Sequence, residues 1–400
     1  MPGSIDFEAR TATTVALLGR DYRGVNFELL CAEGDEVKAG AAVMRDARRP
    51  ELKFTAPAAG RIARIERGAR RKLVALRIEV DATVGCAHYQ PPAGDDRDGL
   101  REFMLESGAW SCLRTRPFGN IPNPGAEPAA IFVTALDAEP MAPEPAPVID
   151  ASLDEFNAAL SVLTKICSAP LYLCQAPGHA PELAQIDRLR RVAFRGGYEA
   201  GLPGVHINAL CPIGFGGGEV WHLGYQDAIA LGQLVLRGTP WLQRVISIGG
   251  NAVKNPRSLL VPAGAAIDQL LADELVDGPT QILAGSSIYG RPISRGQEFL
   301  AAGQRQITVL AGFEKGPETE RTHAGVLIPS ENLERLAPPG IYAVPLMRAL
   351  QLGDAERARE LGVLELVEED VAPLSHACVS NNDYGRLLRR VLDRLEPGYR

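Results

Sequence analysis

Short apolar runs separated by turns fill the chain from residue 14 to residue 80, without any stretch of helical periodicity. Apolar residues alternate with polar or small ones over 74–80, as in a strand that buries one face. Glycine and charged residues mark a turn at 32–40, and a second turn follows at 54–60. We therefore expect a β-rich domain at the start of the chain and place it at residues 1–98.

The two turns of this domain read GDEVKAG and FTAPAAG. Their spacing resembles the hammerhead of biotinyl and lipoyl carrier domains. Those carriers hold a lysine for modification at the tip of a hairpin, and this sequence has no counterpart of that lysine. The resemblance therefore implies a structural hammerhead rather than an acyl carrier.

Strands and helices alternate through the middle of the chain. Ser152 and Glu155 have the spacing of a capping box at the start of one amphipathic helix, and the proline-rich stretch 140–147 is expected to be an extended connection. Such alternation favours a parallel sheet with helices on its faces, so we expect a Rossmann-like α/β domain at 99–255. The expected helices lie at 100–110, 153–163 and 225–237, and the expected strands at 130–135, 171–174 and 244–248.

The order of elements changes in the last part of the chain. A strand, a short helix at 265–275 and another strand follow one another over 258–284, which predicts a compact β-grasp (SLBB-like) domain at 256–330. A stripe of apolar residues over 387–395 predicts a C-terminal helical domain at 331–400. The expected fold class is thus α/β multidomain, with hammerhead, Rossmann-like, β-grasp and helical domains in that order.

The composition is that of a soluble globular protein. Of the 400 residues, 46% are hydrophobic and 23% charged, close to the average for such proteins. The formal net charge of −7 is spread along the chain, which disfavours a nucleic-acid partner. No apolar run approaches the roughly 18 residues that cross a bilayer, and Met1–Arg10 lacks the features of a signal peptide. Any membrane contact is therefore expected to go through a partner.

The seven cysteines are widely spaced and form no C-x-x-C pair, as in proteins of a reducing compartment. An iron–sulfur cluster normally needs four thiolates, several of them close together in sequence. We therefore expect no cluster and no metal site. The cysteines are Cys31, Cys86, Cys112, Cys167, Cys174, Cys211 and Cys378.

Local segments spread over most of the chain carry a family likeness. They read VALLGRDYRG, KFTAPAAGRIARIERGARR, ESGAWSCLRTRPFGNIP, AIFVTALDAEPMAP, GYQDAIALGQL, VISIGGNAVKNPR, GVLELVEEDVAP and DYGRLLRRVLD. With the domain order, these segments resemble the NqrA family, whose members belong to the Na⁺-translocating NADH:quinone reductase. The resemblance implies a peripheral subunit on the cytoplasmic side of the bacterial inner membrane, with subunits B to F as partners and ubiquinone at the junction with the membrane subunit. Such a subunit supports electron transfer from NADH to quinone coupled to Na⁺ export without being catalytic alone.

Two features depart from the family pattern. The opening MPGSIDFEARTATT lacks the usual glycine-rich start, and the segment after Phe313 is several tens of residues shorter than in the typical subunit. Both features leave open a paralogous scaffold subunit that serves another redox complex.

The resemblance also bears on cofactors. The family is related to the flavin- and NADH-binding subunit of respiratory complex I, whose Rossmann-like domain carries a glycine-rich loop. The corresponding segment here, 106–112, reads ESGAWSC and has a single glycine beside a tryptophan. A flavin phosphate packs against bare backbone N–H groups, which takes several glycines. We expect no tightly bound cofactor, and the alternative is a soluble NADH-binding flavoprotein.

Candidate site residues follow this segment. Trp110, Arg114, Arg116 and Phe118 place two guanidinium groups among aromatic rings, a mixture that can bind a quinone head group or an acidic partner surface. We expect these four to lie near the quinone or a partner. The alternative is an arginine pair on a solvated helix end. No catalytic residue is expected.

Other polar clusters give weaker signals. Gly214–Glu219 is a dense glycine run that suits either an anion-binding nest or a flexible loop. His206, His222 and Cys211 have a spacing that fits no common zinc pattern. His323 has no nucleophile paired with it in the sequence. These residues are interpreted as structural.

Overall fold

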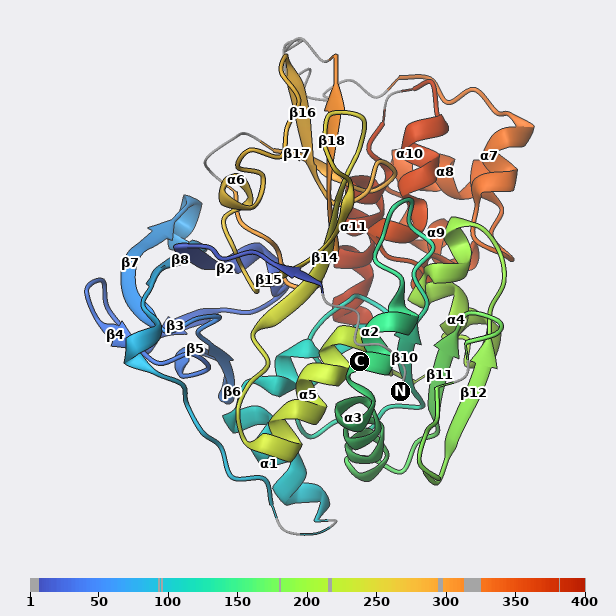
Figure 1. The fold of residues 1–400 in the computed structure, drawn as a ribbon. Coiled ribbons are helices and arrows are strands. Elements are labelled where there is room, and N and C mark those ends of the chain that lie inside the picture. Colours follow the sequence, from blue (N-terminus) through green and yellow to red (C-terminus); the bar gives the residue numbers. More distant parts are fainter. Residues whose placement is uncertain are drawn as a thin grey trace.

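The computed structural model describes residues 7–399 apart from 93, 95, 180, 215–217, 294–297, 313–324 and 381. Its strands form sheets of six, five, four and three strands. Figure 1 shows the chain passing from a β-rich lobe (blue) to an α/β layer (green) and a six-stranded sheet (gold), with the C-terminal helices (orange and red) beside the α/β layer. The predicted fold class is confirmed.

The N-terminal lobe contains the two smallest sheets, which share one core. Its strands are β2 (Thr14–Leu18), β3 (Phe27–Leu29), β4 (Glu36–Val37), β5 (Ala42–Asp46), β6 (Arg49–Thr55), β7 (Gly60–Arg67) and β8 (Leu73–Val80). The sheet orders are β2-β8-β7-β4 and β3-β5-β6. The alternation predicted over 74–80 is present only in part. Leu76 and Ile78 are fully buried and Glu79 is exposed, but Val74 is 48% exposed and Ala75 is buried.

The α/β layer is built on the five-stranded sheet. Its strands are β9 (Arg114–Arg116), β10 (Ile131–Ala135), β11 (Leu171–Gln175), β12 (Leu189–Ala193) and β13 (Val220–Gly224), and its helices are α1 (Arg97–Glu106), α2 (Pro145–Ala151), α3 (Leu153–Lys165), α4 (Pro203–Leu210) and α5 (Tyr225–Arg237). The order is β12-β11-β10-β13-β9, parallel except for β9. β10 and β11 are buried throughout, as expected for a parallel sheet covered on both faces.

Two different layers cover this sheet. Ile131 and Val133 of β10 belong to a core shared with α3, α5 and the N-terminal lobe, whereas Phe132 belongs to a core shared with the C-terminal helices. The backbones of α3 and α5 touch, since a Cβ on Gly232 would lie 1.6 Å from the Glu155 carbonyl oxygen. The C-terminal helices are therefore the second layer of the α/β part.

The six-stranded sheet joins one strand from the start of the chain to five strands between residues 243 and 311. Its elements are β1 (Glu8–Ala9), β14 (Gln243–Gly249), β15 (Arg257–Pro262), α6 (Ile267–Leu270), β16 (Thr280–Ala284), β17 (Arg291–Ile293) and β18 (Gln306–Ala311). The strand order is β1-β15-β14-β18-β16-β17. The strand expected over 244–248 is predicted to belong to the α/β sheet, and this prediction is wrong. β14 instead pairs with β15, the next strand along the chain, and with β18.

Three local predictions in the α/β part are wrong. The stretch 140–147 is predicted to be extended, but α2 begins at Pro145, where proline lacks the N–H that a first helical turn leaves unpaired. The Ser152 side chain makes no cap hydrogen bond, because Ser152 joins α2 directly to α3. The helix expected over 100–110 ends at Glu106, and a 3₁₀ turn follows at Ala109–Cys112.

The C-terminal part is helical, as predicted. Its helices are α7 (Glu331–Leu336), α8 (Ala343–Leu352), α9 (Ala355–Glu360), α10 (Ala372–Ala377) and α11 (Tyr384–Leu395). The apolar stripe of α11 faces the core, where Leu388, Val391 and Leu392 are buried. Among the described helices, none is long and apolar enough to cross a membrane.

Candidate functional site

The order of the five-stranded sheet reverses beside β10. From β10 the chain continues to β11 and β12 on one side and then returns to β13 on the other. The carboxyl ends of β10 and β13, the strands at this reversal, are where sheets of this kind bind ligands. A cavity of about 580 Å³ lies at this point, within the size range of small-molecule sites.

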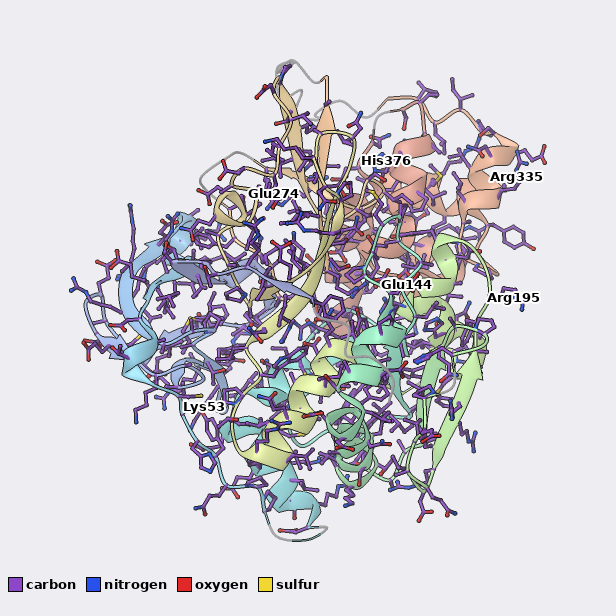
Figure 2. The ribbon with its side chains drawn as sticks, in the orientation of Figure 1. Lys53, Glu144, Arg195, Glu274, Arg335 and His376 are labelled. Atoms are coloured by element: carbon purple, nitrogen blue, oxygen red, sulfur yellow. The ribbon has the colours of Figure 1, made fainter. Side chains whose placement is uncertain are left out.

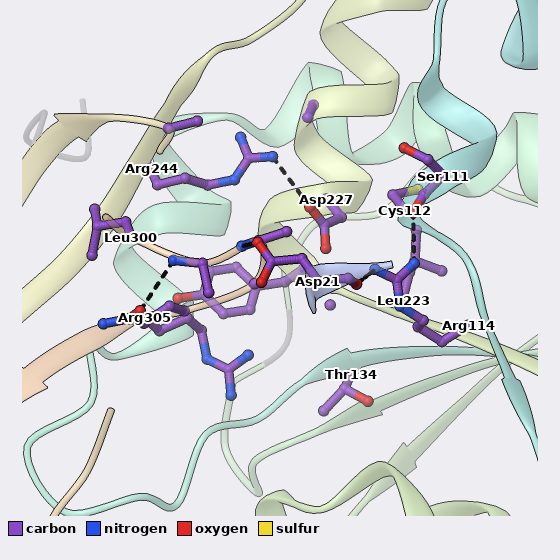
Figure 3. Close-up of a pocket in the computed structure, with 18 of the residues that line it drawn as sticks. Asp21, Ser111, Cys112, Arg114, Thr134, Leu223, Asp227, Arg244, Leu300 and Arg305 are labelled. Atoms are coloured by element: carbon purple, nitrogen blue, oxygen red, sulfur yellow. Dashed lines mark hydrogen bonds and ion pairs between the residues drawn. The ribbon is translucent and has the colours of Figure 1, made fainter. Parts of the chain in front are cut away.

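Every part of the chain contributes to the cavity wall. The N-terminal lobe supplies Asp21 and Tyr22, the loop that precedes β17 supplies Tyr289, and the segment before β18 supplies Arg305. The C-terminal part supplies Glu369. Figure 3 shows Asp21 and Arg305 approaching from elements that are far apart in the sequence. The shape of the cavity therefore depends on how all these parts pack together, and Figure 2 shows how densely side chains fill the space between them.

The guanidinium of Arg305 is bound through its Nε atom, whereas its Nη atoms face the cavity. Its Nε lies 2.5 Å from Oδ2 of Asp137, a carboxylate that follows β10 and is only 3% exposed. The Nη atoms have no hydrogen-bond partner among the described residues, and 36% of the arginine side chain is exposed. Arg305 lines the cavity, so it presents two fixed donors to a ligand.

Two further polar side chains line the cavity from the sheet. Thr134, at the carboxyl end of β10, is 8% exposed, and its hydroxyl has no partner among the described residues. His222 of β13 also lines the cavity, and burial, with the charges of Arg116 and Arg114, holds its pKa well below the ordinary value. The imidazole is therefore neutral near pH 7, and the Thr134 hydroxyl is available to a ligand.

Several carboxyl groups of the cavity hold their protons unusually tightly. Burial raises the pKa of Glu369 to about 7, against the opposing charge of Arg116. Burial also raises the pKa of Glu139, and it raises that of Asp21 to about 6. Near neutral pH, Glu369 is therefore partly protonated and able to donate a hydrogen bond.

Arg114 is the one predicted site residue that lines the cavity. Its Nη1 donates to the Ser111 carbonyl at 2.6 Å, and its Nη2 donates to the Asp21 carbonyl at 3.2 Å. The guanidinium lies 5.8 Å from the centre of the Tyr22 ring. Arg114 forms no ion pair with a described residue, so its charge is available to the cavity.

The other three predicted residues are buried away from the cavity. The Trp110 indole N–H donates to the Pro122 carbonyl at 3.0 Å, and Phe118 packs against the ring of Tyr399. Arg116 forms a buried ion pair with Asp370 at 2.7 Å. The structure thus does not gather the four residues into one site. A contact of Arg114 with quinone or a partner stays a prediction.

The segment 106–112 packs against the N-terminal lobe. Gly108 has a φ of +76°, and a Cβ at this position would lie 2.9 Å from Thr55 Cγ2. The single glycine is explained by this close packing. The residues that follow form a 3₁₀ turn whose Trp110 is buried. The segment has a single glycine, whereas a flavin phosphate packs against several bare backbone amides, so the absence of a bound flavin stays a prediction.

The remaining candidates of the sequence do not form a metal site. The His206 ring Nε2 lies 2.7 Å from the Ala200 carbonyl oxygen, and burial lowers its pKa to about 4. Among the described residues there is no group of three His, Cys, Asp or Glu that could hold a metal ion. Residues 215–217 of the glycine run, and His323, lie outside the described residues.

Sequence reasoning missed the main polar residues of the cavity. Thr134 and Asp137 lie at the end of a strand that was predicted, and the rule for reversed strand order would have indicated them once β13 was recognised. Arg305 and Glu369 belong to other parts of the chain and carry no local signal. Only the tertiary structure brings them to this strand end.

Three family models match the chain in order. They are the NqrA N-terminal barrel-sandwich hybrid domain over residues 3–81, the NqrA second alpha/beta domain over 95–240 and the NQRA C-terminal domain over 245–295. A chain of a solved NAD⁺-reducing [NiFe]-hydrogenase aligns with 76% of this chain, and 62% of its own, at 14% identity and a TM-score of 0.43. That likeness is too slight to support an assignment.

Named relatives match almost end to end. The NqrA subunit of the Na(+)-translocating NADH-quinone reductase of Klebsiella pneumoniae is 38% identical over 96% of this chain and 93% of its own length. The same subunits of Pseudomonas aeruginosa and Neisseria meningitidis are 35% and 34% identical over 97% and 99% of this chain, and over 94% and 96% of their own lengths. The chain therefore belongs to the NqrA family of Na⁺-translocating NADH:quinone reductase subunits.

Proposed function

We propose that this chain works as the NqrA subunit of a Na⁺-translocating NADH:quinone reductase, bound to subunits B to F on the cytoplasmic side of the membrane. The observation that carries the proposal is the extent of the likeness, since 96% of this chain aligns with 93% of a relative of that name. In this role the subunit supports electron transfer from NADH to quinone coupled to Na⁺ export, and it is not catalytic alone.

The proposed subunit carries no flavin or iron–sulfur cluster of its own. The packing of Gly108 against Thr55 supports this, because the segment that would hold a flavin phosphate is used to join two domains. Among the described residues no group of three His, Cys, Asp or Glu could hold a metal ion, whereas a cluster normally needs four thiolates, and this supports the absence of a cluster.

A quinone head group suits the chemistry of the cavity. It is neutral and planar, and its two carbonyl oxygens accept hydrogen bonds. Thr134 and Arg305 supply donors that no described residue uses, and the rings of Tyr22 and Trp241 supply flat apolar surface. We place ubiquinone at this cavity, with Arg114 at its rim.

One observation favours a second candidate, a soluble NADH-binding flavoprotein. The cavity lies at the strand ends where related sheets bind nucleotides. This alternative predicts a yellow protein that reduces dyes with NADH when isolated. The absence of a glycine run at 106–112 weighs against it.

The two functions are distinguished by purification of the tagged chain, alone and from detergent-solubilised membranes. The subunit proposal expects the isolated chain to be colourless and to show no NADH-dependent dye reduction. It expects the chain from membranes to bring down membrane-embedded redox subunits. A visible flavin band on the isolated chain, or a chain that brings down no such subunits, contradicts the proposal.

A further inference from the structure

One guanidinium serves two carboxyl groups at the wall of the cavity. Arg116 is almost fully buried, and its Nη1 donates to Asp370 Oδ2 at 2.7 Å while its Nη2 donates to Glu369 Oε1 at 3.0 Å. Asp370 is also fully buried and accepts a second hydrogen bond, of 2.7 Å, from the Val367 backbone N–H. A single positive charge balances only one of two carboxylates, so the two carboxyl groups together hold a proton more tightly than usual.

Glu369 carries this proton. Its Oε1 accepts from Arg116, and its Oε2 has no hydrogen-bond partner among the described residues. Glu369 lines the cavity, and 31% of its side chain is exposed, so solvent reaches it. Burial raises its pKa to about 7, with the charge of Asp370 acting in the same direction and the charges of Arg116 and Arg305 opposing the shift. Near pH 7 about half of the molecules therefore hold a proton on Glu369.

Four further ionisable groups lie near Glu369 on other parts of the chain. The Tyr198 hydroxyl donates to the Glu369 backbone carbonyl at 3.1 Å. Burial raises the pKa of both tyrosines of this set, so they are neutral near pH 7, and it also raises the pKa of the single glutamate. Among these four groups, the arginine alone therefore carries a charge that opposes protonation of Glu369. They are Tyr198, Tyr289, Glu139 and Arg305.

A quinone in the cavity needs protons as well as hydrogen bonds. It becomes a quinol by taking up two electrons and two protons, and in the reductase the electrons come from NADH. Arg305 and Thr134 can donate hydrogen bonds to the quinone oxygens, but neither group releases a proton near pH 7. A carboxyl whose pKa lies near the working pH is a far better acid. Glu369 meets this requirement and opens on the same cavity.

We propose that Glu369 donates one of the two protons to the quinone as it is reduced in the cavity. The O–H bond of the carboxyl breaks while a bond forms between the proton and a quinone oxygen, and the two electrons come from NADH through the other subunits. The Glu369 carboxylate that remains faces Arg116 and takes up its next proton from solvent, which also supplies the second proton of the quinol. The inference rests on the proposed function, since that function places the quinone in the cavity and supplies the electrons.

The test measures quinone reduction by the assembled reductase that carries Glu369→Gln. The amide keeps the size of the side chain and an oxygen for Arg116, but it has no acidic proton. The matched control is Glu368→Gln, because Glu368 lies next to Glu369, pairs with Arg389 at 2.6 Å and does not line the cavity. A third variant, Glu369→Asp, keeps an acid at the position.

Each tagged chain is co-expressed with the other subunits and purified from detergent-solubilised membranes. The rate with NADH and a soluble quinone is measured from about pH 6 to about pH 9, across the range in which Glu369 loses its proton. A parallel assay replaces the quinone by ferricyanide, which accepts electrons without protons. The two assays separate the delivery of protons from the delivery of electrons.

The proposal expects Glu369→Gln to lower kcat for the quinone at least about tenfold at pH 6, with KM changed less than about twofold. The rate with ferricyanide should stay at the wild-type value. The wild type and Glu368→Gln should lose quinone reduction as the pH rises through about 7, because the donor loses its proton, and Glu369→Gln should lack this step. Glu369→Asp should recover part of the rate.

Two outcomes overturn the donor role and leave the proposed function intact. In one, Glu369→Gln keeps the wild-type kcat and pH profile. In the other, it raises KM alone, which means that the carboxyl binds the quinone without giving it a proton. A wild-type reductase that reduces no quinone, or a wild-type chain that recovers no other subunits, refutes the proposed function itself.

An infrared measurement on the isolated full chain decides the matter even if Glu369→Gln does not assemble with its partners. A protonated carboxyl and a carboxylate absorb at different frequencies. The proposal expects a protonated-carboxyl band that fades as the pH rises through about 7, that is missing in Glu369→Gln and that persists in Glu368→Gln. The same band in the wild type and in Glu369→Gln overturns the proposal.

Discussion

Arg305 and Asp137 form an ion pair of 2.5 Å that joins the segment before β18 to the carboxyl end of β10. Asp137 is almost fully buried, whereas Arg305 is partly exposed in the cavity. One guanidinium therefore links two sheets and also offers donors to a ligand. The ion pair places the candidate site at a joint between domains.

The Arg305→Ala variant is expected to lower the free energy of unfolding by roughly 2–3 kcal/mol, because Asp137 is left as a buried carboxylate without its partner. Chemical denaturation measures this loss. Arg357→Ala, which removes an exposed pair with Glu360, is the control and should cost less than about 0.5 kcal/mol. If Arg305→Ala lowers the free energy of unfolding no more than Arg357→Ala does, the ion pair of Arg305 does not stabilise the fold.

The Thr134→Val variant should leave the fold as stable as the wild type or stabilise it by about 1 kcal/mol, since it removes a buried hydroxyl that has no partner among the described residues. The proposed quinone site predicts that the same variant raises the KM of the assembled reductase for a soluble quinone. Unfolding curves and steady-state kinetics test the two halves separately. A destabilised protein, or an unchanged KM, would contradict the role assigned to this hydroxyl.

Asp21 makes stability depend on pH. Burial raises its pKa from 3.8 to about 6, so the folded chain binds this proton more tightly than the unfolded chain does. The contribution of Asp21 to stability therefore falls as the pH rises from about 4 to about 6. Asp21→Asn should match the wild type near pH 4 and exceed it by roughly 2 kcal/mol at pH 8. Chemical denaturation at both pH values measures the difference in free energy of unfolding between the variant and the wild type. The same difference at pH 4 and at pH 8 would refute the prediction.

Gly232 permits the contact between α3 and α5. A methyl group at this position would lie 1.6 Å from the Glu155 carbonyl oxygen, so the Gly232→Ala variant must push the helices apart and should lose about 3 kcal/mol or more. Gly224→Ala is the control, because a Cβ there meets nothing within 4 Å. Thermal unfolding of both variants tests the contact. Similar melting temperatures would mean that the helices move apart freely.

Most of the fold could be predicted because its elements have local signals. The alternating residues of β8 and the apolar run of β10 each predict a strand. The apolar stripe of α11 predicts a helix. β14 has such a signal too, but its pairing partners β15 and β18 depend on contacts that no local pattern specifies. For this reason the sequence predicts the strand itself but assigns it to the wrong sheet.

The site could be predicted only in part. The pattern of arginines among aromatic residues indicates four residues, of which Arg114 lines the cavity. The other three, Trp110, Arg116 and Phe118, are buried away from it. Glu369 reaches the cavity from the far end of the chain and has no sequence feature that links it to β10. Long-range packing, rather than composition, decides which polar residues share the cavity.

The most direct test of the central claim is the rate of Na⁺-stimulated NADH:quinone reduction by membranes from cells that lack this chain. The proposed function predicts that the Na⁺-stimulated rate is lost and that it returns when the chain is supplied with its natural partners. A Na⁺-stimulated rate that stays unchanged without the chain would contradict its role as the NqrA subunit.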